Sequence, residues 1–185
     1  MRARVRRARA RGAGLEVPTS DDRASGKVRN RKSAIQGRLD LGDFQEVWQL
    51  HQSGAFMYAA LLHYSENEGR RVLPFELPIW WVGLSLRFAS QFYGELMQEG
   101  RIRYEFRLDG VKGQRLGRLR DDGRRMYDDY TCLETTIEAV GMTSIAGLST
   151  AWRSTVAAAI RPMYSLFGWE ITAATIDGQL DELGR

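Results

Sequence analysis

The sequence predicts an α+β fold: an antiparallel sheet of about four to six strands packed against two main helices, behind a disordered basic N-terminal arm. The prediction rests on three patterns. Apolar and polar residues alternate in residues 44–62 and 101–108, which is typical of half-buried strands. Apolar residues recur every three or four positions in residues 77–96 and 152–167, which indicates helices. Residues 1–38 are rich in Arg, Gly and Ser and poor in large apolar groups, so burial there cannot offset the entropy of ordering the chain.

Length and charge favour a single domain over residues 39–185 that follows the arm. A chain of 185 residues is long enough for one domain with a core. The net charge of +4 is unevenly distributed, because residues 1–38 carry 12 Lys and Arg against three Asp and Glu, while residues 39–185 carry 15 against 20. The one cysteine, Cys132, cannot form a disulfide within the chain, and no apolar signal-peptide core follows the charged start. We therefore expect a cytoplasmic protein.

The first element predicted in the domain is a β-hairpin in residues 44–62. Gly54, in the polar sequence "QSG", suits the positive-φ position of a short hairpin loop. The apolar residues that flank this loop are Phe44, Val47, Trp48 and Leu50 before it, and Phe56, Tyr58, Ala60 and Leu62 after it. The polar sequence "SENEGRR" then connects the hairpin to the next element.

A helix is predicted to begin near Pro78, since proline is tolerated in the first turn of a helix. Its apolar face is formed by residues at helical spacing: Leu77, Trp81, Leu84, Phe88, Phe92 and Leu96. Polar residues interrupt the apolar run at Arg87, Gln91 and Glu95, so it is shorter than the ~20 residues that a membrane span requires. We expect this helix to pack on the sheet, with Trp80 at the rim as part of a partner surface and with no contact with a membrane.

The clearest predicted strand is residues 101–108. Its apolar residues are Ile102, Tyr104, Phe106 and Leu108, and they alternate with Arg101, Arg103, Glu105 and Arg107. This alternation predicts a strand with its apolar side chains facing the core and its charges facing solvent. The glycines of "DGVKG" predict a turn, after which "QRLGRLR" is expected to return as a strand, and "YTCLETTIEA" predicts a further one.

A second long helix is predicted from the sequence "SIAGLSTAWRSTVAAAIRPMYSLFGWE". Its apolar face comprises Trp152, Val156, Ile160, Met163 and Phe167. Pro162 is expected to kink or divide this helix, and Gly168 suits the left-handed position that follows a helix end. A short amphipathic turn is expected near the C-terminus, through Ile176, Leu180 and Leu183.

Residues typical of metal, cofactor or catalytic sites do not form a recognisable pattern. His51 and His63 with the single Cys132 do not make a zinc site, and we expect a structural or surface role for both histidines. The carboxylates around "DDGRRMYDD" do not match a calcium-binding loop. The glycines near residue 113 do not match a nucleotide-binding motif, and no nucleophile has an evident base. We therefore expect no metal, no cofactor and no catalytic residue, and an enzyme is the less favoured hypothesis.

The basic arm is the strongest chemical signal in the sequence. Its Lys and Arg side chains would neutralise a nucleic-acid backbone and release counterions, which gives affinity with little sequence preference. The residues that we expect to bind nucleic acid are Arg2, Arg4, Arg6, Arg7, Arg9, Arg11, Lys27, Arg29, Arg31 and Lys32. The alternatives are that the arm is a linker or an upstream extension read from an early start codon. Arg101, Arg103 and Arg107 offer a second, weaker basic patch, for which a solvated sheet face is the alternative.

The order of these motifs is similar to the C-terminal region of bacterial proteins that carry a Schlafen-AlbA-type DNA-binding domain. The similarity lies in "FQEVWQLHQSGAFMYAALL", the apolar helix, "YEFRLDGVKGQRL" and "LFGWE", and covers residues 44–170. The resemblance implies turn roles for Gly54, Gly110 and Gly113 and a helix end at residues 167–169. The DNA-binding domain itself is expected upstream, and residues 1–39 are too short and too polar to form it. Its function therefore does not transfer to this chain, and no catalytic residue carries over.

Three hypotheses follow for the function. The first is a non-catalytic interaction or regulatory module that acts with a nucleic-acid-handling partner domain or protein, with Trp80 and Trp169 as a partner surface. The second is direct, non-specific DNA or RNA binding through the basic arm. The third is an enzyme, which would require a pocket with convergent carboxylates or histidines.

Overall fold

The structure is a computed structural model that describes residues 27–31, 34–41, 44–60, 65–67, 70–97, 99–118, 126 and 129–183. Within these ranges the chain forms strands and helices in an α+β fold, as the sequence predicts. The described residues before position 64 belong to one compact unit and those after it to another. The one domain predicted over residues 39–185 includes residues of both units, and its assignment as a domain stays a prediction.

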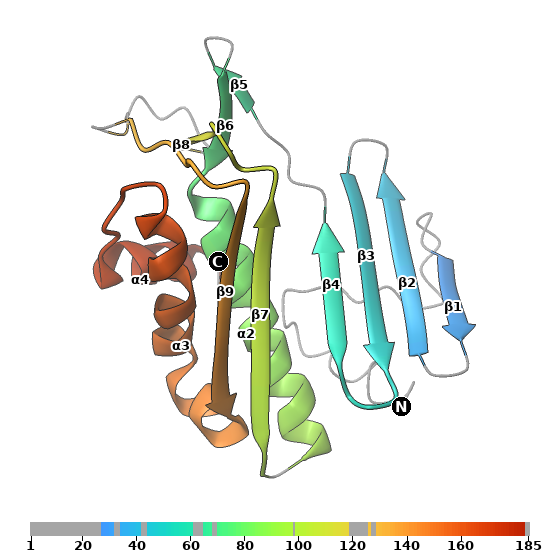
Figure 1. Cartoon of the computed structure of the whole chain (residues 1–185). Helices are drawn as coiled ribbons and strands as arrows, with labels where there is room; N and C mark the ends of the chain where they lie inside the picture. Colours follow the sequence, from blue (N-terminus) through green and yellow to red (C-terminus); the bar gives the residue numbers. More distant parts are fainter. Residues whose placement is uncertain are drawn as a thin grey trace. The chain divides into compact units, whose positions relative to one another are not determined.

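The first unit is a four-stranded antiparallel sheet in the order of the chain (Figure 1). Its strands are β1 (Lys27–Arg31), β2 (Ala34–Leu41), β3 (Phe44–His51) and β4 (Phe56–Ala60). The predicted hairpin is confirmed, because Leu50 on β3 pairs with Phe56 on β4 and Gly54 adopts a φ of 87° between them. Trp48 and Leu50 are buried, as the alternation of apolar residues predicts.

The sheet extends into the stretch that the sequence predicts as a disordered arm. Strand β1 and the first five residues of β2 lie within residues 1–38, and β2 pairs with β3 from Ala34 opposite His51 to Leu41 opposite Phe44. Strands of such polar sequence are difficult to predict, because no local apolar pattern marks them. They are stabilised by backbone hydrogen bonds to the neighbouring strand of the sheet. Residues 1–26, 32 and 33 of the predicted arm lie outside the described residues.

In the second unit two small sheets replace the single antiparallel sheet that was predicted. One contains β5 (Ser65–Asn67), β6 (Arg70–Pro74) and β8 (Arg115–Gly117), and the other contains β7 (Arg101–Asp109) and β9 (Thr136–Ser144). The predicted return strand is β8, but it runs parallel to β6 and does not pair with β7. The turn residues Gly110 and Gly113 have φ values of 73° and 75°, and the Gly110 amide donates to the Thr135 carbonyl. The turn therefore extends the β7–β9 pairing before the chain enters β8, which lies beside β6.

Helix α2 (Glu76–Leu96) lies behind the β7–β9 pair in Figure 1, and α3 (Ile145–Ser165) lies beside β9. Helix α4 (Ala173–Glu182) packs against both helices. The predicted buried face of α2 is partly wrong. Phe88 and Phe92 are buried, whereas Leu77, Trp81, Leu84 and Leu96 are only half-buried. The other large buried side chains are Ile79, Val82 and Leu86. Because α2 contacts both α3 and α4, its buried surface is wider than the single stripe that periodicity identifies.

The apolar face predicted for α3 is confirmed at four of its five residues: Val156, Ile160 and Met163 are buried along the helix and Phe167 just after it, whereas Trp152 is only half-buried. The predicted kink at Pro162 is not where the helix deforms. The non-helical residue is Ala151, with φ −133° and ψ 34°. A proline leaves the carbonyl four residues earlier without its amide donor. That residue, Ala158, is exposed, so water can hydrogen-bond to its carbonyl.

The C-terminal part follows the sequence prediction closely. Gly168 has a φ of 80° just past the end of α3, in the left-handed region where glycine is favoured. Ile176 and Leu180 are buried on α4. Across the described part of the chain, none of the helices has the length and apolar character needed to cross a bilayer.

Candidate interaction surfaces

One face of the β7–β9 pair is exposed and strongly patterned. On β7 the side chains of this outer face are charged and exposed: Arg101, Arg103, Glu105, Arg107 and Asp109. Their partners on β9 are, in the same order, Ser144, Met142, Val140, Glu138 and Thr136. These ten residues are called the β7–β9 outer face below. The alternating pattern of β7 predicts this arrangement, because successive side chains of a strand point to opposite faces of a sheet.

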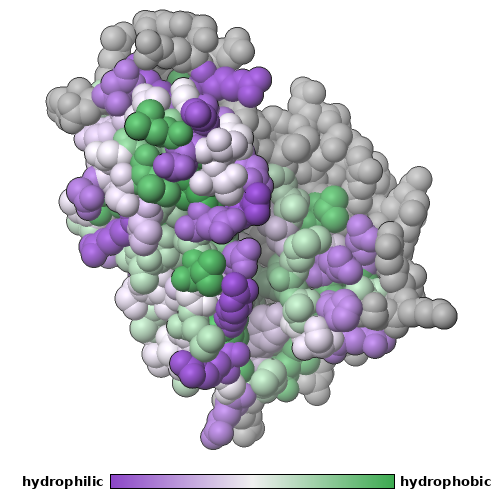
Figure 2. Space-filling view, viewed as in Figure 1, coloured by the Kyte–Doolittle hydropathy of each residue, from purple (hydrophilic) through white to green (hydrophobic). Residues whose placement is uncertain are grey.

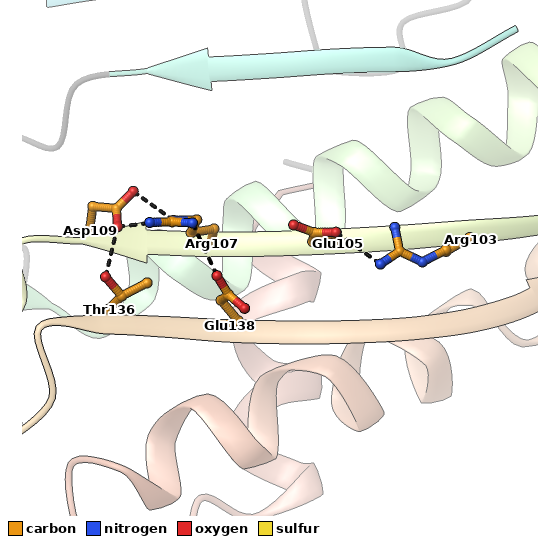
Figure 3. A network of polar contacts seen from close by, with 6 residues as sticks. All are labelled: Arg103, Glu105, Arg107, Asp109, Thr136 and Glu138. Atoms are coloured by element: carbon orange, nitrogen blue, oxygen red, sulfur yellow. Dashed lines mark hydrogen bonds and ion pairs between the residues drawn. The ribbon is translucent and has the colours of Figure 1, made fainter. Parts of the chain in front are cut away.

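A polar network links the two strands at one end of this face (Figure 3). Arg107 Nε donates to Asp109 Oδ2 at 2.9 Å, and Arg107 Nη1 donates to Glu138 Oε1 at 3.2 Å. Thr136 Oγ1 donates to Asp109 Oδ1 at 2.8 Å. Further along β7, Arg103 Nη2 donates to Glu105 Oε2 at 3.0 Å. The network joins residues adjacent along β7 with residues across the pair, so it orients the charged side chains of the face.

The charges of the outer face balance one another. Hydrogen bonds from Arg107 and Thr136 lower the pKa of Asp109, and the hydrogen bond to Asp109 raises the pKa of Arg107. Both shifts favour the ionised forms of Arg107 and Asp109. The outer face carries three arginines against three acidic residues, Glu105, Asp109 and Glu138. The weak basic patch predicted at Arg101, Arg103 and Arg107 is thus neutralised by neighbouring carboxylates, which makes it a poor surface for a polyanion.

Apolar side chains interrupt the charged face on the β9 side. Val140 and Met142 are 56% and 55% exposed, although both lie in the middle of a strand. Figure 2 shows hydrophobic atoms among hydrophilic ones on the side of the second unit that carries β7 and β9. Exposed apolar side chains within a charged rim are typical of protein interaction sites.

The two tryptophans predicted as a partner surface have contacts within the second unit. Trp80 Nε1 on α2 donates to the backbone carbonyl of Gln179 on α4 at 3.1 Å. The Trp169 ring lies edge-on to Phe75 and Tyr164, with centroid distances of 5.2 and 5.4 Å. Both tryptophans are half-buried. These contacts attach α4 and the end of α3 to the rest of the unit, so each tryptophan has a structural role.

Tyr164 is the buried centre of the aromatic cluster around Trp169. Its hydroxyl donates to the backbone carbonyl of Phe75, the residue that precedes α2. Burial, and secondarily the charge of Glu76, raises the pKa of Tyr164 well above its ordinary value. The neutral hydroxyl therefore holds the start of α2 against α3. Such a group is not available for acid–base chemistry near neutral pH.

The predicted nucleic-acid-binding residues are only partly within the described chain. Lys27, Arg29 and Arg31 occupy alternate positions of β1, and Lys27 pairs with Arg38 on β2. Arg38 was not among the residues predicted, because its position opposite Lys27 depends on the β1–β2 register. Outside the described residues lie Arg2, Arg4, Arg6, Arg7, Arg9, Arg11 and Lys32.

The polar residues considered as metal ligands or nucleophiles have other contacts where they are described. His51 Nδ1 lies 3.0 Å from the Ser53 hydroxyl, and Asp129 forms an ion pair with Arg115 at 3.0 Å. Within the ranges that the structure covers, no group of three potential metal ligands converges. His63 and three of the predicted loop carboxylates, Asp121, Asp122 and Asp128, lie outside those ranges. Cys132 is buried, and desolvation raises the pKa of its thiol, which makes it a weak nucleophile.

Comparison with known proteins adds no family assignment. No family model, curated protein or solved structure matches the chain. The resemblance to the C-terminal region of Schlafen-AlbA-type proteins therefore stays a prediction from the sequence.

Proposed function

We propose that this chain is a non-catalytic, cytoplasmic interaction module that acts with a nucleic-acid-handling partner protein. The observation that carries the proposal is the β7–β9 outer face, where exposed Val140 and Met142 lie beside an ordered, charge-balanced network. A protein partner can bury the apolar side chains while the surrounding ion pairs remain at the rim. The charge balance of the face favours a protein partner over direct contact with phosphates.

The type of partner is taken from the sequence. The resemblance to a region that accompanies Schlafen-AlbA-type DNA-binding domains supports a partner that handles nucleic acid. In this arrangement the chain supplies a docking surface, and the partner supplies the contacts with nucleic acid.

The test is site-specific photo-crosslinking in cells with a photoreactive amino acid at position 142 of the full chain. We expect a discrete adduct with a nucleic-acid-handling protein that persists after nuclease treatment. The matched control places the same residue at position 166, because Leu166 is a similarly exposed apolar residue, at 42%, outside the outer face. Equal adduct patterns at the two positions, or no adduct at position 142, would overturn the proposal.

Direct nucleic-acid binding is the second candidate, and the β1–β2 register favours it. Lys27, Arg29 and Arg31 alternate along one strand with Arg38 opposite Lys27, so folding groups four basic positions on one hairpin. Such a group would contact successive phosphates and give a salt-dependent affinity.

This candidate is tested by titrating generic duplex and single-stranded DNA with the full chain over a salt series. Replacing Lys27, Arg29 and Arg31 with Gln should lower the slope of log K against log salt by about 3 if each contacts one phosphate. Point variants are needed because a truncation at residue 38 would remove β1 and part of β2. A second variant that replaces the six arginines between residues 2 and 11 measures the contribution of that segment separately. An unchanged slope in both variants would exclude this mode of binding.

A further inference from the structure

The edge of β7 opposite β9 has the backbone geometry of an unpaired strand. Two backbone hydrogen bonds continue the β7–β9 ladder just beyond the two ends of β7. The Ile145 amide donates to the Gly100 carbonyl, and the Gly110 amide donates to the Thr135 carbonyl. On the β7 side both bonds therefore involve even-numbered residues. In an antiparallel ladder these bonds recur at every second residue. The amides and carbonyls of the odd-numbered residues therefore point to the other edge. Among the strands that the structure describes, none pairs there.

The odd-numbered residues of β7 also carry its charges, in the order Arg101, Arg103, Glu105, Arg107 and Asp109. We infer that this edge pairs antiparallel with β7 of a second copy of the chain, with Phe106 on the two-fold axis. In this register Arg103 lies opposite Asp109 of the second copy, and Glu105 lies opposite Arg107 of the second copy. By symmetry each pair occurs twice, so four opposite-charge pairs form across the new interface.

The charge order selects this register over its neighbours. With the axis at Glu105, that residue would face its own copy and Arg103 would face Arg107. With the axis at Arg107, that residue would face its own copy and Glu105 would face Asp109. Like charges opposite one another destabilise a strand pair, so both shifts are disfavoured. The ion pairs already present along β7, Arg103 with Glu105 and Arg107 with Asp109, are compatible with the favoured register.

The opposite face of β7 supports the same pairing. Tyr104 and Phe106 are only half-buried, with ring centroids 5.6 Å apart, although the sequence predicts that this face points to the core. In the dimer, Phe106 lies beside Phe106 of the second copy, and Tyr104 lies opposite Leu108 of the second copy. The two-stranded sheet becomes four-stranded, which gives it the extra pairing that isolated two-stranded sheets lack. Backbone hydrogen bonds supply the affinity, and the charges set the register.

The test is sedimentation velocity of the full chain over a range of concentrations, with two charge-reversal variants. Glu105→Arg places an arginine opposite Arg107 of the other copy, and Arg107→Glu places a glutamate opposite Glu105 of the other copy. The dimer dissociation constant of each variant alone should therefore be at least about tenfold higher than that of the wild type. Mixed in equal amounts, the two variants face each other with opposite charges and should restore the dimer. Glu182→Arg, which makes the same charge change at an exposed position on α4, should sediment as the wild type does.

A backbone variant tests the edge itself. Glu105→Pro removes an amide directed at the free edge of β7 and should weaken the dimer. Val140→Pro on β9 is the matched control, because by the same ladder rule its amide points to the far edge of β9. A wild-type chain that stays monomeric, a dimer insensitive to these β7 variants, or a mixture that forms no more dimer than its components would overturn the inference. The inference does not depend on the proposed function, which concerns a different partner on the outer face.

Discussion

Tyr104 on β7 covers the face of Gly141, its direct partner on β9. A Cβ atom at position 141 would lie 2.7 Å from Tyr104 Cε2 and closer still to the Cζ and Oη atoms. We predict that Gly141→Ala lowers the free energy of unfolding by about 1–3 kcal/mol, because the tyrosine ring must leave its position. Chemical denaturation of the full chain measures this change.

The control is a double-mutant cycle with Tyr104→Val, which removes the ring and keeps a residue favoured in strands. In that background Gly141→Ala should be nearly neutral. The same cost in both backgrounds would mean that the glycine is required by its own backbone conformation, not by the tyrosine.

The hydrogen bond from Trp80 to the Gln179 carbonyl predicts that Trp80→Phe loosens α4. Loss of one part-buried hydrogen bond costs about 0.5–1.5 kcal/mol, so the amides of α4 should exchange with solvent roughly twofold to tenfold faster. Hydrogen-exchange mass spectrometry of residues 173–182 checks this. Trp81→Phe makes the same chemical change one residue along α2 and should leave α4 unaffected. Equal effects of the two variants would contradict a specific role of the Trp80 indole.

Two glycines near the C-terminus are predicted to respond to alanine with opposite signs. Gly168 has a φ of 80°, so Gly168→Ala should cost about 1–2 kcal/mol, although nothing lies within 4 Å of the added methyl group. Gly178 lies inside α4 with open space around it, so Gly178→Ala should stabilise the chain by up to about 1 kcal/mol. Thermal unfolding of both variants tests the pair, and shifts of the same sign would refute the explanation by backbone conformation.

The buried hydroxyl of Tyr164 predicts a loss of stability at alkaline pH. Its pKa is raised well above the ordinary value of 10.0, so the unfolded chain releases this proton at a lower pH than the folded chain does. The stabilising contribution is complete below pH 10 and decreases above it, by up to about 1.4 kcal/mol per pH unit until the folded-state pKa is reached. Denaturation curves measured on either side of pH 10 should show this decline.

Two phenylalanine variants serve as controls for the alkaline transition. Tyr164→Phe should be less stable at neutral pH, because the Phe75 carbonyl loses its donor, and its stability should fall less steeply above pH 10. Tyr58→Phe, in the other compact unit, should keep the decline of the wild type. An unchanged decline in Tyr164→Phe would assign the transition to other groups.

The sequence by itself determined the elements whose signal lies in neighbouring residues. The alternation of β7, the β3–β4 hairpin with Gly54 at positive φ, the buried stripe of α3 and the left-handed Gly168 were all predictable. Each depends on periodicity or turn chemistry within a few positions of the chain. The charge order along β7, on which the inferred dimer depends, was likewise readable before the fold was known.

Only the tertiary structure decided which strands pair and which faces are buried. Strand β8 pairs parallel with β6, with Arg115 beside Val72. These two residues are more than 40 positions apart in the sequence, and no local pattern specifies that partner. The polar strand β1 is stabilised by pairing with β2. Helix α2 is buried on additional sides by contacts with α3 and α4. The ion pair of Arg107 with Glu138 likewise requires the β7–β9 register. These features depend on hydrogen bonds and packing between distant segments, whose free energy belongs to the assembled fold and not to either segment alone.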